Sequence, residues 1–117
     1  MLNVSAVPKP LACNLGAFNP KQRREHTVLV HRVFRAVEQV RDLRDGLAFR
    51  LPTKMNVALE ATQFIMLERL CCPFFNFAFK VESDGATWLH ITGGKGVKQF
   101  IKPEFGLANL KISRRQT

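Results

Sequence analysis

The sequence predicts a single α+β domain, in which a small, largely antiparallel sheet of three or four strands is covered by three helices. Two observations predict this class. Apolar residues recur at spacings of three and four in two long segments, as in helices buried on one side, and residues 75–82 alternate between apolar and polar, as in a strand. The expected element order is β-α-β-α-β-β-α. We expect one domain over residues 1–117, with mobile tails at 1–10 and 106–117.

The first half of the chain is expected to form an edge strand, a long helix and a second short strand. The short apolar run at 11–13 predicts the edge strand, and the Asn-Pro pair at 19–20 supplies a cap and a first-turn proline for the helix. An Asp-Gly pair at 45–46 is expected to end that helix, and residues 47–51 alternate as a strand. The predicted buried stripe of the helix consists of Val30, Val33, Phe34, Val37 and Val40.

The second half is expected to form a helix, a hairpin and a last short helix. The helix runs from about residue 56 to residue 70 and stops before a proline, which cannot continue it. Strand 75–82 turns at 83–85 and is expected to pair with an antiparallel strand at 87–92. A glycine-rich turn at 93–96 then leads into the short helix.

The cysteine content indicates a cytoplasmic protein with reduced thiols. The chain has 3 cysteines, an odd number and too few for a secreted disulfide framework. Cys71 and Cys72 are adjacent, so their Cα atoms lie about 3.8 Å apart, closer than an unstrained disulfide prefers. A Pro-Lys-Pro run at 8–10 interrupts any signal peptide, and no apolar stretch is long enough to cross a membrane.

Three thiols and two polar neighbours are the candidate chemical site. Glu68 stands three residues before Cys71 and four before Cys72, so on a helix its carboxylate overlies both thiols. Glu68 also adjoins the apolar face of the helix, where a carboxylate needs a partner or a metal. His26 begins the apolar stripe of the first helix and is expected to point into the same interior.

A soft metal ion is the ligand that such a cluster favours. Cys13, Cys71 and Cys72 would supply three thiolates, which suit Hg²⁺, Cu⁺ or arsenite. Zn²⁺ would take Glu68 or His26 as a fourth ligand. The alternative is that the cysteines are small buried apolar residues without a chemical role.

Catalysis by a thiol is less favoured than binding. The vicinal cysteines follow a helix C-terminus, where the helix dipole disfavours a thiolate by about 0.3–1 kcal/mol. The sequence also shows no fixed Cys/His signature of a thiol enzyme. We therefore expect a binding protein rather than an enzyme, with a thiol-dependent enzyme as the third hypothesis.

The positive charge supports a second hypothesis, an interaction module for nucleic acid or an acidic protein. The chain has 18 Lys and Arg against 9 Asp and Glu, a net charge of +9 that is spread along its length. No nucleic-acid-binding motif is recognisable. The candidate contact residues are Arg23, Arg24, Arg32, Arg35 and Trp88.

The cysteine motifs resemble those of a group of small bacterial proteins. That group shows Ala-Cys-x-Leu near the N-terminus, here residues 12–15, and Glu-x-x-Cys-Cys-x-Phe after a central helix, here residues 68–74. The similarity spans roughly residues 11–102 and includes a final helix that contains Gly-Val. Such proteins resemble companions of heavy-metal resistance functions. The resemblance implies a thiol site without naming an activity.

Overall fold

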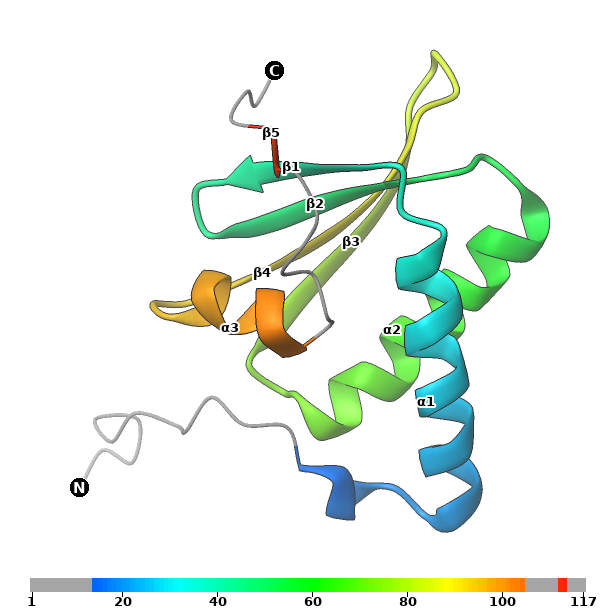
Figure 1. Cartoon of the computed structure of the whole chain (residues 1–117), viewed down its shortest axis with the longest axis vertical. Helices are drawn as coiled ribbons and strands as arrows, with labels where there is room; N and C mark the ends of the chain where they lie inside the picture. The colour runs from blue at the N-terminus through cyan, green and yellow to red at the C-terminus, as the bar shows by residue number, and fades with distance from the viewer. Residues whose placement is uncertain (1–13, 105–111, 114–117) are drawn as a thin grey trace, which may run out of the picture.

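One sheet carries the described helices on a single face (Figure 1). The structure, a computed structural model, describes residues 14–104 and 112–113, with side chains described up to residue 101. The strands lie in the order β3-β4-β2-β1-β5, and the predicted α+β class is confirmed. In chain order the elements are η2 (Leu15–Ala17), α1 (Pro20–Arg35), β1 (Gln39–Leu43), β2 (Gly46–Leu51), α2 (Met55–Cys71), β3 (Phe75–Val81), β4 (Thr87–Gly93), α3 (Val97–Glu104) and β5 (Ile112–Ser113).

Helix α1 begins where the sequence predicts. The Asn19 side chain accepts a hydrogen bond from the backbone N–H of Gln22 at 2.8 Å, and the Gln22 side chain accepts one from the backbone N–H of Asn19 at 3.1 Å. This reciprocal capping box satisfies two N–H groups that the first turn leaves without a helical partner. Pro20 occupies the first helical position, where its missing N–H costs nothing.

The predicted C-terminus of this helix is wrong. Helix α1 ends at Arg35, and residues 39–43, which the apolar spacing assigns to the helix, form strand β1. Leu43 pairs with Gly46, so the residues between them form a two-residue hairpin turn that joins β1 to β2. Val40 is buried in the core, as expected, but from a strand. The Asp-Gly pair does not stop a helix but belongs to this hairpin.

The inner face of the sheet and the three helices enclose one core. In the antiparallel pairing of β2 with β4, Phe49 lies opposite Leu89 and Leu47 opposite Ile91, all four being fully buried. The helices contribute the following buried residues to this core: Leu29, Val33, Phe34, Val57, Ala61, Phe64, Cys71, Val97 and Ile101. The expected strands at 47–51, 75–82 and 87–92 and the expected second and third helices are therefore confirmed.

Strand β5 is the only part of the expected C-terminal tail that the structure describes. It pairs in parallel with β1, Val40 lying opposite Ile112. The expected edge strand at 11–13 and the rest of both expected tails lie outside the described residues. Within the described part of the chain, no helix has the length and apolar character that a membrane span requires.

The hairpin that replaces the end of the predicted helix makes Gly46 a critical position. A Cβ atom there would lie 2.0 Å from the backbone oxygen of Ile91. We expect Gly46→Ala to lower the free energy of unfolding by about 1–3 kcal/mol, because β2 and β4 must separate locally. Urea denaturation measures the loss. Gly94→Ala is the matched control, since a Cβ there meets nothing within 4 Å; equal losses in both variants would contradict the close approach.

Candidate metal centre

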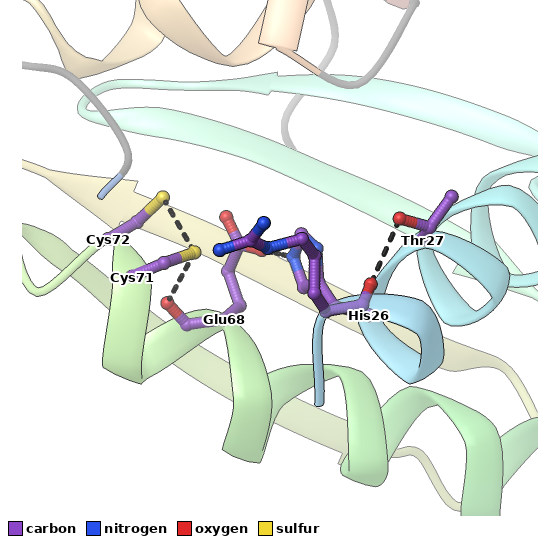
Figure 2. A network of polar contacts seen from close by, with 6 residues as sticks. His26, Thr27, Glu68, Cys71 and Cys72 are labelled. Carbon is purple, nitrogen blue, oxygen red and sulfur yellow. Dashed lines mark hydrogen bonds and ion pairs between the residues drawn. The ribbon is translucent and has the colours of Figure 1, made fainter. Parts of the chain in front are cut away.

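A polar contact between two helices lies at the centre of the site. The Nε2 atom of His26, from the second turn of α1, lies 2.5 Å from the Oε1 atom of Glu68, from the last turn of α2. The Glu68 side chain is fully buried and that of His26 nearly so. Figure 2 shows the two side chains approaching each other from their separate helices. Buried polar groups need such partners, and here each group supplies the other with one.

The vicinal cysteines lie at the C-terminus of the same helix. Cys71 stands one turn after Glu68, and its Sγ atom lies 3.6 Å from the backbone oxygen of Glu68. Cys72 is the C-cap residue, and its backbone N–H donates to the same oxygen at 2.8 Å. The two Sγ atoms are 3.5 Å apart and both residues are fully buried. The Glu68 spacing predicted from the sequence brings its carboxylate within 4.8 Å of the Cys71 sulfur.

The redox states of the two cysteines differ. The sulfur of Cys72 is disulfide-bonded, which departs from the expectation of reduced thiols, whereas Cys71 is outside any disulfide. Cys71 thus carries the thiol that, in the described part of the chain, lies beside His26 and Glu68. The remaining predicted ligand, Cys13, lies outside the described residues.

The segment before α1 covers the site. The backbone N–H of Asn14 donates to the carbonyl oxygen of Cys71 at 2.8 Å, which attaches this segment to the end of α2. The Phe18 ring is buried, and its centroid lies 4.9 Å from that of the His26 imidazole; the Phe64 ring lies 6.5 Å from the imidazole. Sequence reasoning missed Phe18. Its position immediately before the Asn19 cap was the available signal.

The three donor atoms form a compact, chemically mixed set. One ligand atom from each of His26, Glu68 and Cys71 can be chosen so that all lie within 4.8 Å of one another. Imidazole nitrogen, carboxylate oxygen and thiolate sulfur are all ligands of Zn²⁺ and related ions. To bind a metal ion, His26 and Glu68 would each have to present an unprotonated ligand atom.

Trp88 does not lie with the arginines that were expected to contact nucleic acid together with it. Arg23, Arg24, Arg32 and Arg35 lie on α1, which packs on the inner face of the sheet. Trp88 packs with Ala48 in a separate cluster on the outer face. Only 3% of Trp88 is exposed, and the Arg41 guanidinium lies 4.2 Å from its ring centroid. Trp88 therefore does not offer an open face for a base to stack on.

His90 lies beside Trp88 on this outer face and is partly buried. Burial lowers the pKa of His90, the positive charge of Lys80 lowers it further, and Glu82 acts in the opposite direction. The folded protein therefore favours the neutral imidazole. His90 lies on the outer face of the sheet and is not part of the candidate metal centre.

Comparison with protein families, curated proteins and solved structures finds no significant match to this sequence. The resemblance drawn from the cysteine motifs therefore stays a prediction. The site is interpreted from its own geometry.

The His26–Glu68 contact is expected to stabilise the fold strongly. His26→Leu leaves the buried Glu68 carboxylate without its imidazole partner, so we expect the free energy of unfolding to fall by about 3–5 kcal/mol. Replacing both residues by leucine is expected to recover part of this loss, because no buried charge then remains. Urea denaturation measures both. His31→Leu, at an exposed position of the same helix, is the control, and equal losses for the two histidine variants would contradict the role of the contact.

The depressed pKa of His90 predicts a pH-dependent loss of stability. Because the folded-state pKa lies below the unfolded value of 6.5, the unfolded chain takes up a proton first as the pH falls. The stabilisation is therefore complete above pH 6.5 and declines below it. We expect the urea midpoint to fall less in His90→Gln than in the wild-type protein between about pH 7.5 and about pH 5.5. Parallel pH profiles of the two proteins would refute this assignment.

Proposed function

We propose that the protein binds a thiophilic metal ion through Cys71, Glu68 and His26. The observation that carries this proposal is the convergence of three different donor atoms within 4.8 Å, from two helices whose ligands His26 and Glu68 are 42 positions apart in the sequence. Each donor is buried, so the site excludes competing water. A metal ion would neutralise the carboxylate and the thiolate together, which hydrocarbon surroundings alone cannot do.

The composition of the donor set favours Zn²⁺ over softer ions. Hg²⁺ and Cu⁺ prefer sites made of sulfur, whereas Cys71 supplies one thiolate beside a nitrogen and an oxygen donor. Zn²⁺ accepts this mixture and fills its remaining position with a fourth ligand or water. This order of metal preference differs from that of a site with three thiolates, which binds the softer ions best.

The other two cysteines extend the proposal to the softer ions. Reduction of the Cys72 disulfide would place a second thiol 3.5 Å from the Cys71 sulfur. We include Cys13, which lies outside the described residues, because it completes the three-thiolate set predicted from the sequence. Full reduction in the cytoplasm, the location expected from the cysteine content, would then create a sulfur-rich site that suits Hg²⁺ or Cu⁺.

Metal binding should displace protons, which gives the proposal a readout that does not depend on the identity of the ion. The Cys71 thiol must lose its proton to become a ligand, so we expect the release of at least about one proton for each ion bound. Affinity should accordingly weaken as the pH falls, because protons compete with the metal for the same atoms. A pH-indicator titration in weakly buffered solution counts the protons.

Native mass spectrometry with Zn²⁺, Cu⁺ and Hg²⁺ tests the binding itself, on protein kept fully reduced. We expect one ion per chain in the wild-type protein and affinities more than about tenfold weaker in Cys71→Ser and Glu68→Gln. Glu60→Gln, on the same helix, and His31→Asn, on the other, are the matched controls and should bind as the wild type does. Circular dichroism confirms that each variant is folded.

Unchanged stoichiometry and affinity in both Cys71→Ser and Glu68→Gln would exclude the proposed site. The His26–Glu68 contact would then be a structural element of the core. The stability of the variants separates these two outcomes, because a purely structural pair changes unfolding without any response to the metal.

A further inference from the structure

An apolar groove runs along the outer side of the α1–α2 pair, away from the core. It has a volume of about 680 Å³ and is lined by residues of both helices. Three apolar side chains in its lining are strongly exposed: Val28 at 46%, Leu59 at 57% and Met66 at 57%. Exposed apolar side chains that gather in one hollow commonly mark a binding surface. The two α2 residues are seven positions apart, about two helical turns or 10.5 Å.

The two walls of the groove differ in character. The α2 wall presents Leu59 and Met66, with Thr62 and Gln63 as its uncharged polar residues. The α1 wall contains Arg24 and Arg32, and Lys21 and Arg35 continue this exposed basic row along α1 beyond the groove lining. Glu25 is the acidic residue of the groove lining, and Arg32 also forms an ion pair with Glu60 at 3.0 Å. The α2 side of the lining is thus uncharged, whereas the α1 side combines apolar Val28 and Leu29 with the basic row along its edge.

We propose that this groove binds an amphipathic helix of a partner protein, with acidic residues along one flank of its apolar stripe. The apolar stripe would pack against Leu59 and Met66, and the acidic flank would lie along the basic row of α1. Anchors two turns apart match the i and i+7 positions of a bound helix. Met66 can adapt its flexible side chain to the shape of the partner.

Charge decides against a second copy of the chain as the occupant. A two-fold dimer would bring the same basic row of α1 onto itself or beside it, with Glu25 and Glu60 as the nearby acids. The net charge of +9 on each chain would add to the repulsion. An acidic helix instead complements the row. Nucleic acid would leave the apolar α2 wall uncovered, and a flat membrane surface does not fill a hollow between two helices.

A selection from a helical peptide library tests the proposal directly. Each peptide carries an apolar stripe, and its flanking positions are randomised between Glu and Lys. The full chain is the target, and the variant Leu59→Lys/Met66→Lys is used for counter-selection. We expect enrichment of Glu along one flank. The selected peptide should bind the variant more than about tenfold more weakly than the wild type in fluorescence anisotropy. Val81→Lys, an exposed apolar position outside the groove lining, is the matched control and should not change binding.

Reversal of charge provides the second arm. Arg24→Glu is expected to weaken binding of the acidic peptide and to improve binding of its Lys counterpart. The proposal is overturned if no peptide is enriched, if the enriched flanks carry no excess of Glu, or if the double variant binds equally well. Light scattering that shows a dimer lost in Leu59→Lys/Met66→Lys, or flotation with anionic phosphatidylglycerol vesicles that depends on these residues, would also overturn it. None of these residues belongs to the proposed metal site, so the two proposals fail independently.

Discussion

The buried contact between His26 and Glu68 is the interaction on which the arrangement of the helices depends. It joins two segments that are distant in the sequence, and it can form only when the second turn of α1 faces the last turn of α2. That alignment fixes where the Cys71 thiol lies and lets Phe18 pack over the imidazole. A buried carboxylate is costly without a partner, so packings of the two helices that separate Glu68 from His26 are disfavoured.

Most of the elements were predictable from the sequence because the pattern of each fits one type of secondary structure. The alternation in β3 fits a strand alone, and the Asn-Pro cap of α1 fits a helix start alone. Residues 36–43 were misassigned because Val37 and Val40 continue a helical spacing while also suiting a strand. Strand pairing decides between helix and strand here, because Leu43 pairs with Gly46 and Val40 with Phe49. Strand β2 pairs in turn with β4. Such contacts are not visible in a local pattern.

The candidate site was predictable in part for the same reason. Glu68 and Cys71 belong to one helical turn, so their spacing alone places them together. His26 required the further inference that the apolar stripes of two helices face one core. Phe18 and the groove beside Leu59 and Met66 were missed, since both depend on how α1 and α2 are set against each other. The sequence did not show that Trp88 and the arginines of α1 lie on opposite faces of the sheet.

The polar site and the apolar groove use opposite sides of one pair of helices, so their compatibility depends on how far metal binding moves the pair. Two ligand atoms at about 2.0–2.1 Å from a tetrahedral Zn²⁺ lie about 3.3 Å apart. His26 and Glu68 now lie 2.5 Å apart, so the metal must separate their ligand atoms by less than about 1 Å. Rotation of two long side chains provides such a shift without movement of the backbone. The groove should therefore keep its shape, and the two surfaces can be occupied at the same time.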